Sequence, residues 1–469
     1  MRDLFDAHKL HFQNTFPMPY ANRMEALDKL ETMLLDNEQA LIAAVNADFG
    51  QRVAQETQLL ELMPLLREIR HSKRHLKRWM RASKVLTDWL FWPSRARVMY
   101  QPLGVVGIMG AWNYPISLTL TPLANALAAG NAAMIKPSEL APATSALLAQ
   151  LIAQTFHPAQ VSVVEGDAQI AAAFSALPFD HLIFTGSGRI GKKIMAAAAQ
   201  NLTPVTLELG GKSPAIIQKD FSIEQAAQRI ISAKMWNAGQ TCIAPDYVWL
   251  HASQKNTFIE AALATMQTRW GDVTQSADYS HMINEAAWQR MSDLVASAVA
   301  QGARAHAVPA TPSTEANHRH VFAPVLLTDV TEEMRVMSDE IFGPILPIMT
   351  YEAFDEVLTY VNGHDKPLSL YYFDDNARRA EQVLSRTHAG GAVVNDCMFH
   401  YAQSNLPFGG VGGSGMGAYH GHAGFLRFSA SKAVLLQSSI AAKVLNRLIK
   451  PPYTKWTNRL IRFLFKSRF

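Results

Sequence analysis

The chain has 469 residues, of which 49% are hydrophobic and 17% charged, and its net charge is +4. This length allows two or three domains with sizeable cores, and the small charge, without a basic surface interleaved with aromatic residues, argues against nucleic acid as a partner. Two cysteines are too few for a disulfide framework, and no signal peptide or membrane-spanning run is evident, so we expect a cytoplasmic protein.

The first half of the chain shows helical patterns followed by alternating strands and helices. Helices are expected over residues 23–46 and 55–79, and the segment 85–100, rich in Trp, Val and Phe, is typical of extended strands that cross to a partner. Strands are then expected at 105–110, 132–137, 161–164, 181–185 and 204–209. Ser138 is expected to N-cap the helix that runs through Gln154. This alternation predicts a doubly wound parallel sheet.

The same pattern restarts after Gly210 and Gly211. Strands are expected at 215–217, 248–250, 342–349, 369–373 and 392–395, with helices between them and a polar loop over 309–320. We therefore predict a second α/β domain of about 185 residues.

Cys242 ends a stretch in which a helical pattern breaks down. The apolar pattern of residues 230–236 gives way to the polar run 237–241, and Gly239 lets the backbone come close to whatever Cys242 faces. These features place Cys242 on a loop at the end of an element, where reactive residues are usually held. The alternative is a buried cysteine that packs as a small apolar residue.

A glycine-rich turn at residues 186–191 matches the G-x-G-x-x-G pattern of dinucleotide sites, since it follows a predicted strand and opens a predicted helix. In this pattern an acidic residue about 20 positions later binds a ribose hydroxyl, and that residue would be Glu208. Glu208 also precedes Gly210 and Gly211, and a carboxylate on such mobile backbone suits a general base. A ligand-free turn and a surface acid are the structural alternatives.

Two further motifs are weak signals when taken alone. Lys136 and Glu139 follow a strand at the sheet edge where nucleotides bind, but an acid near a helix N-terminus is common. The segment 340–344 is similarly unspecific.

Together, the motifs resemble the aldehyde dehydrogenase superfamily over residues 20–435. They occur in the family's order as WNYP (112–115), KPSE (136–139), FTGS (184–187), LELGGK (207–212), GQTC (239–242), EIFGP (340–344) and NLPFGGVGGSGMG (405–417). The short N-terminus and the segment 414–421 are similar to the class 3 subgroup, including its bacterial coniferyl-aldehyde dehydrogenase-like branch.

The resemblance implies a reaction and three catalytic residues. Cys242 matches the nucleophile, which forms a thiohemiacetal with the aldehyde and then a thioester. Asn113, with the backbone N–H of Cys242, matches the oxyanion hole. Glu208 matches the base that activates water to release the acid, which overrides the ribose role. Cys397 is expected to line the substrate channel or pack beside it, rather than to act as a second nucleophile.

The resemblance also implies an NAD cofactor, with NADP possible. His364, His388 and His400 lack the spacing of metal ligands, so no metal site is expected. The matching cofactor-binding residues are Lys136, Glu139, Gly186, Ser187, Gly191, Leu209, Gly210, Glu340 and Phe342. Glu139 would repel a 2′-phosphate, which favours NAD. An aromatic substrate wall of Trp112, Tyr114, Trp236, Phe399 and Tyr401 is one interpretation, and core packing is the other.

The implied fold has two doubly wound parallel-sheet domains and a small β oligomerisation arm. Residues 1–84 and 101–209 would bind NAD(P), residues 210–395 would be catalytic, and residues 85–100 and 396–435 would form the arm of a homodimer. Residues 436–469 depart from the soluble class 3 pattern, because they form a basic amphipathic tail suited to a membrane surface or to docking on protein.

Two rival functions follow from the same motifs. A coenzyme A-acylating relative would generally lack an acid at the position of Glu208. A catalytically silent binding protein on this fold would tend to lose Cys242 or Glu208. Because both residues are present, we expect oxidation of a medium- or long-chain aliphatic or an aromatic aldehyde to the acid.

Overall fold

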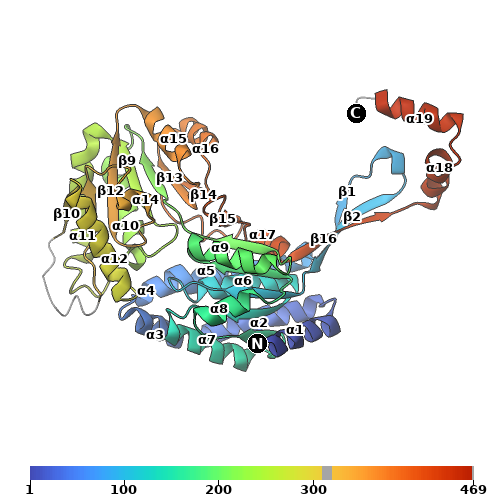
Figure 1. Cartoon of the computed structure of the whole chain (residues 1–469), viewed down its shortest axis with the longest axis horizontal. Helices are drawn as coiled ribbons and strands as arrows, with labels where there is room; N and C mark the ends of the chain where they lie inside the picture. The colour runs from blue at the N-terminus through green and yellow to red at the C-terminus, as the bar shows by residue number, and fades with distance from the viewer. Residues whose placement is uncertain (309–319, 467–469) are drawn as a thin grey trace.

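The computed structural model describes residues 1–308 and 320–466, so the loop expected over 309–320 lies almost entirely outside the described residues. Two α/β bodies lie side by side, and an arm extends from them with the C-terminal helices at its far end (Figure 1). Each body contains one mainly parallel sheet, and the arm contains a third, antiparallel sheet. The predicted fold class, two parallel-sheet domains and a small β arm, is confirmed. The residue ranges given to the domains stay a prediction.

The first sheet has the strand order β15-β7-β6-β3-β4-β5. Its strands are β3 (Val105–Met109), β4 (Ala132–Lys136), β5 (Val161–Val163), β6 (His181–Thr185), β7 (Val205–Glu208) and β15 (Gly415–Met416). The strands are parallel except for β15. After β5 the chain crosses to the other side of β3, and ligands of open sheets bind at the carboxyl ends of strands beside such a switch point. The segments that follow β3, β4, β6 and β7 therefore meet at one edge.

The second sheet has the order β10-β11-β12-β9-β8-β13-β14. Its strands are β8 (Pro214–Ile217), β9 (Tyr247–His251), β10 (Arg304–Ala307), β11 (Val325–Thr328), β12 (Ile345–Tyr351), β13 (Ser369–Phe373) and β14 (Gly391–Val394). Strands β8, β9 and β13 are buried along their whole length, as expected for parallel strands covered by helices on both faces.

The arm is built from two distant parts of the chain. Strands β1 (Ser83–Val85), β2 (Arg95–Pro102) and β16 (Ser429–Leu436) form its sheet, and β16 pairs with β2 along its full length. The pair of strands expected over 85–100 is thus mostly one strand, with the short helix η2 (Trp89–Phe91) in the turn. Helices α18 (Ser439–Ile449) and α19 (Lys455–Lys466) follow β16, and none of the described helices has the length and apolarity needed to cross a membrane.

Helices cover both faces of the two large sheets. In the first body these are α1 (Arg2–Thr15), α2 (Tyr20–Asp36), α3 (Glu38–Phe49), α4 (Ala54–Thr57), η1 (Gln58–Leu62), α5 (Met63–Trp79), α6 (Ser117–Ala129), α7 (Pro142–Thr155), α8 (Ala168–Ser175), α9 (Gly188–Ala199) and α17 (Gly421–Arg427). In the second they are α10 (Ile223–Met235), η3 (Trp236–Gly239), η4 (Ala252–Gln254), α11 (Lys255–Trp270), α12 (Glu285–Ala300), α14 (Arg335–Ser338), α15 (Phe354–Gly363) and α16 (Ala377–Arg386). Every residue of α6 is buried, so this helix is the centre of the first body.

The expected N-cap at Ser138 is wrong. Helix α7 begins at Pro142, and the Ser138 hydroxyl instead accepts a hydrogen bond from Leu140 N in a preceding turn. The helix N-terminus is capped by another element, since the Asp48 carboxylate of α3 accepts hydrogen bonds from Ala143 N and Thr144 N at 2.8 and 2.9 Å. A carboxylate so distant in sequence cannot be found from local capping patterns.

Candidate active site

A cavity of about 830 Å³ collects the predicted site residues at the carboxyl edge of the first sheet. All of them except Gly191 line it. They come from the segments after β3, β4, β6 and β7, from the Cys242 loop and from the segment 340–342. Gly191 lies one step behind, where a Cβ atom would be 2.8 Å from a methyl group of Leu209, so its role is packing under the cavity wall.

The Cys242 loop follows a helix that ends abruptly. Helix α10 stops at Met235, and Asn237 and Gly239 both have positive φ angles, of 52° and 74°. A Cβ atom at position 239 would lie 2.3 Å from the carbonyl oxygen of Gly343. Gly239 therefore allows two motifs far apart in sequence, 239–242 and 340–344, to pack backbone against backbone. This contact confirms the placement of Cys242 on a loop and explains the nearby glycine.

Glu208 is held opposite the thiol. Its carboxylate oxygens lie 4.0 Å from Cys242 Sγ and 3.4 Å from Thr185 Oγ1, and the Tyr419 hydroxyl donates a hydrogen bond to it. Glu208 is the last residue of β7 and is paired with β6 on one side and β15 on the other. The mobility expected from the neighbouring glycines thus begins only after it, and the side chain is oriented by Tyr419 and Thr185.

Burial dominates the ionisation of both groups. It raises the pKa of Glu208 to about 7, against the hydrogen bonds from Tyr419 and Thr185. Burial, followed by the carboxylates of Glu208 and Glu340, raises the pKa of the Cys242 thiol well above its usual value, although the backbone N–H groups of Cys242 and Ile243 oppose this shift. The protein by itself therefore keeps the thiol protonated near neutral pH, and backbone N–H groups alone do not activate it.

Asn113 lies just before the N-terminus of α6, where a buried charge network fixes its backbone. Its side-chain amide donates to the carbonyl oxygen of Gln240 at 3.1 Å, which ties it to the Cys242 loop. Its own carbonyl accepts from Arg52 at 3.1 Å and from Asn237 at 3.0 Å. Arg52 also contacts Glu56 and Glu61 at 3.6 and 3.8 Å.

The two carboxylates of this network bind backbone N–H groups, one in the segment before Cys242 and the other at the start of α6. Glu56 accepts from Asn237 N at 3.0 Å, and Glu61 accepts from Ile116 N and Ser117 N at the start of α6. Arg52, Glu56 and Glu61 were not predicted from the sequence. Glu56 and Glu61 lie in the expected helix 55–79, which gives no local sign of their burial, because the backbone N–H groups that they bind are at least 55 residues away along the chain.

The far end of the cavity suits a dinucleotide. Lys136 is buried and bonded to the half-exposed Glu139 at 2.7 Å, which places a cation and an acid together at the end of β4. Helix α9 begins at Gly188, where a Cβ atom would meet nothing within 4 Å, and the Ser187 side chain makes no cap to its N-terminus. The helix end and the open glycine leave room for a phosphate, and Lys136 with Glu139 can bind ribose hydroxyls.

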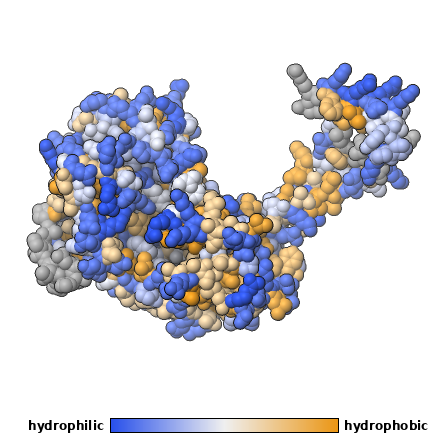
Figure 2. Space-filling model, in the orientation of Figure 1, coloured by the Kyte–Doolittle hydropathy of each residue, from blue (hydrophilic) through white to orange (hydrophobic). Residues whose placement is uncertain are grey.

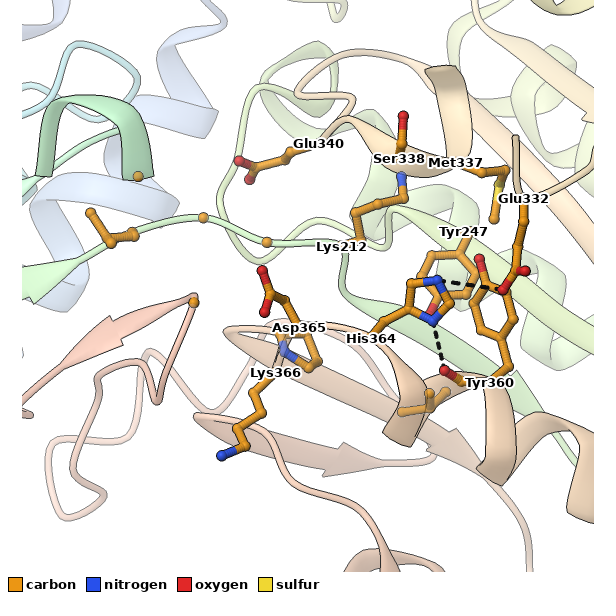
Figure 3. Close-up of a pocket in the computed structure, with 17 residues that line it drawn as sticks. Lys212, Tyr247, Glu332, Met337, Ser338, Glu340, Tyr360, His364, Asp365 and Lys366 are labelled. Atoms are coloured by element: carbon orange, nitrogen blue, oxygen red, sulfur yellow. Dashed lines mark hydrogen bonds and ion pairs between the residues drawn. The ribbon is translucent and has the colours of Figure 1, made fainter. Parts of the chain in front are cut away.

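Glu340 forms the wall between this cavity and a second pocket of about 410 Å³. A Cβ atom at position 210 would lie 2.1 Å from a carboxylate oxygen of Glu340, so only glycine allows this contact. Figure 3 shows Glu340 and Lys212 at one side of the second pocket and His364 between Glu332 and Tyr360 at the other. Cys242 does not line this second pocket, so we assign the second pocket no part in the chemistry.

Aromatic residues divide between the two sides of the thiol. Trp112 lines the cofactor end and contacts the Phe342 ring at 5.4 Å. Three phenol groups lie beside Cys242 and Glu208: the Tyr114 hydroxyl is hydrogen-bonded to Thr241 Oγ1 at 2.6 Å, that of Tyr371 donates to the carbonyl oxygen of Ile243, and that of Tyr419 donates to Glu208. Trp236 packs against the half-exposed Phe399 at 5.9 Å. The second cysteine, Cys397, is fully buried and does not line the cavity.

Residues 3–434 match the model of the aldehyde dehydrogenase family. The chain belongs to this family. It is 44% identical to a probable coniferyl aldehyde dehydrogenase of Pseudomonas aeruginosa, over 96% of this chain and 93% of that protein. It is 37% identical to rat aldehyde dehydrogenase family 3 member A2, over 98% of this chain and 93% of that protein. The structure of Staphylococcus aureus AldH in a substrate-bound state superposes with a TM-score of 0.92 at 35% identity, covering 99% of both chains.

The expected family and its class 3 character are thus confirmed, and the activity follows from them. Aldehyde dehydrogenases oxidise aldehydes to carboxylic acids with NAD or NADP, so the protein is an oxidoreductase that acts on a small-molecule aldehyde. The cavity described above provides one end for the dinucleotide and a thiol at the other.

Proposed function

We propose that Cys242, Glu208 and Asn113 carry the oxidation. The Cys242 sulfur attacks the aldehyde carbon as its proton passes to solvent water, and the carbonyl oxygen becomes the oxyanion of a thiohemiacetal. When bound, the cofactor accepts the hydride that leaves this carbon, and its positively charged nicotinamide ring favours the ionised thiol. A thioester remains on Cys242. The distance of 4.0 Å between the sulfur and Glu208 supports this pairing of nucleophile and base.

Glu208 completes the cycle as a general base. It takes a proton from a water molecule, which attacks the thioester carbon, and the thiolate of Cys242 leaves as the acid forms. The Tyr419 hydrogen bond supports this role, because it fixes one carboxylate oxygen and turns the other towards the sulfur. The presence of this oriented base favours hydrolysis over transfer of the acyl group to coenzyme A.

The proposed cofactor contacts follow the cavity from one end to the other. Lys136 and Glu139 bind the adenosine ribose, Gly186 and Ser187 the phosphates, and Glu340 the nicotinamide ribose, with Leu209, Gly210 and Phe342 as the intervening wall. The carboxylate of Glu139, held by Lys136, supports a preference for NAD because it would repel a 2′-phosphate.

Asn113→Ala is expected to lower turnover by about 10²–10³-fold, because one of two oxyanion donors is lost. An amide group carries two hydrogens, of which Gln240 takes one, so the other is available to the oxyanion. The measurement is steady-state turnover together with the NAD dissociation constant, which should change little. A large loss of NAD affinity at unchanged turnover would instead make Asn113 a structural residue of the cofactor site.

We propose an aromatic, coniferyl-aldehyde-like substrate. The phenol groups around the sulfur and the pair Trp236–Phe399 support it, as does the 44% identity to the relative from Pseudomonas aeruginosa. Aromatic contacts stabilise an aromatic ligand beyond its area alone, so kcat/KM for cinnamaldehyde should exceed that for nonanal, which has the same number of carbons, by roughly 10-fold. NADH absorbance gives both values. Faster oxidation of nonanal would point to an aliphatic substrate, and oxidation of neither would contradict the activity itself.

We further propose a cytoplasmic homodimer whose C-terminal tail makes peripheral contact with a membrane. Strand β16 is an edge strand of the arm sheet and is mostly exposed, with Leu435 and Leu436 about half exposed. An open strand edge with apolar side chains favours pairing with a second copy. These features support the arm as the dimer contact.

A further inference from the structure

The outer end of the arm gathers three segments that lie far from the active site. They are the turn 86–94 between β1 and β2, helix α18 and helix α19 (Figure 1). Ser94 accepts a hydrogen bond from Ser438 N at 3.0 Å, and Ser438 in turn caps α18. The two helices contact each other. The turn and the tail are thus joined, and we call them together the arm tip.

The charge of the arm tip differs from that of the rest of the chain. The sequence contains no Asp or Glu after Asp396, and the tail's cations exceed the net charge of +4 of the whole chain. On α19 the four cations Lys455, Arg459, Arg462 and Lys466 recur at helical spacing and form one stripe. Lys443 of α18 and Lys450, the residue directly after this helix, are also exposed. The tail is therefore strongly cationic on a chain whose remaining residues are net acidic.

Large apolar side chains lie beside these cations. Trp456 and Phe463 occupy the stripe of α19 next to the basic one and are 67% and 59% exposed. In the turn, Leu86 is fully exposed and Trp92 is 75% exposed. Figure 2 shows hydrophobic residues along the arm and again on the tail, next to hydrophilic ones. A helix with adjacent apolar and basic stripes is the pattern of segments that lie in a membrane interface, where Trp is also enriched.

We propose that the arm tip docks on an anionic lipid bilayer, with α19 lying in the interface plane and with Leu86 and Trp92 of the turn inserting beside it. The cations meet lipid phosphates, while Trp456, Phe463 and Trp92 enter the boundary of the acyl chains. A second copy of the chain is the alternative occupant, and the oligomeric state of the tail variant distinguishes it from a bilayer. The inference rests on the membrane contact proposed above and specifies its lipid charge and its residues, and it does not rest on the catalytic assignments.

Docking at the arm tip leaves the catalytic cavity free, because the tip lies far from both α/β bodies (Figure 1). The enzyme would then work beside a phase in which hydrophobic aldehydes concentrate. Oxidation would convert them into charged carboxylates that leave the bilayer more readily.

The test is co-sedimentation of the full-length protein with vesicles. Binding is expected with phosphatidylcholine vesicles that contain anionic phosphatidylglycerol, and it should weaken with salt and be largely absent with phosphatidylcholine alone. Arg459→Gln combined with Arg462→Gln should weaken binding by about 25-fold, since each cation near the surface contributes. Trp456→Ala should weaken it as well, through loss of the apolar anchor.

The matched control is Arg74→Gln combined with Lys77→Gln, which removes the same charge from exposed positions of α5 in the first body. It should keep vesicle binding within about twofold of wild type. Both double variants should oxidise aldehyde in vesicle-free buffer as wild type does, which shows that they are folded. Equal binding by the tail variant and wild type, or no binding to anionic vesicles, would overturn the proposal. So would a tail variant that turns dimers into monomers while vesicle binding is unchanged, because the tip would then be a protein interface.

Discussion

Cys242→Ala is expected to lower aldehyde-dependent NADH formation by about 10⁴-fold or more, because the alanine cannot form the thiohemiacetal from which hydride leaves. The side chain is only partly buried and packs at the edge of the core, so the substitution should fold normally. The measurement is single-turnover NADH absorbance with enzyme in excess over aldehyde, since this reads the chemical step apart from product release.

The chain provides its own matched control. Cys397→Ala removes the other cysteine, which is fully buried and lies outside the cavity, so turnover should remain within a few-fold of wild type once stability is accounted for. Similar rates for Cys242→Ala and wild type would exclude Cys242 as the nucleophile. A loss of turnover in Cys397→Ala but not in Cys242→Ala would instead identify Cys397 as the nucleophile.

Glu208→Gln is expected to lower steady-state turnover by about 10²–10⁴-fold while leaving a burst of NADH close to one per active site. Glutamine keeps the shape of the side chain and still accepts the hydrogen bond from Tyr419, but it cannot take a proton from water. Hydride transfer should therefore proceed once, and the thioester should accumulate. Loss of the burst along with turnover would mean that Glu208 is needed before the thioester forms.

The pH dependence of the wild type follows from the same residue. Burial raises the pKa of Glu208 to about 7, so the carboxyl is increasingly protonated below that pH and cannot act as a base. Turnover limited by hydrolysis should thus fall as the pH drops through about 7 and level off above it. Glu208→Gln should lack this limb in its residual turnover.

The sheets were predictable because parallel strands buried on both faces appear as short apolar runs separated by helical patterns. Strands β3, β4 and β6 were predicted within one residue at each end, as was β13. The N-terminus of α7 was not, because Asp48 caps it from another helix. Local patterns carry no information on a cap that depends on how two distant helices pack.

The site was predictable as a set of residues but not as an arrangement. The motifs supplied Cys242, Glu208 and Asn113, and the cavity brings them together. Arg52, Glu56 and Glu61, which hold the surrounding backbone, gave no sign because nothing local marks a buried charge. Tyr419 is similar. It stands 211 residues from Glu208, and only the pairing of β15 with β7 shows that the glycine-rich segment 405–417 lies beside the base.

The pKa of the Cys242 thiol could not be predicted from the sequence. A nucleophilic cysteine usually has a lowered pKa, yet burial and two carboxylates raise the pKa of Cys242. Sequence reasoning placed Glu208 as a base but could not show that its own charge opposes ionisation of the sulfur beside it. We therefore propose that the bound cofactor activates the thiol.

The most direct test of the central claim is the mass of the Cys242 peptide from Glu208→Gln after reaction with aldehyde and NAD. We expect Cys242 to gain the mass of the aldehyde less two hydrogens, because in a thioester the acyl group, which is the aldehyde less one hydrogen, replaces the hydrogen of the thiol. An unmodified Cys242, an adduct on Cys397, or an adduct with the full mass of the aldehyde would contradict it, because none of these is an oxidised acyl group on the proposed nucleophile.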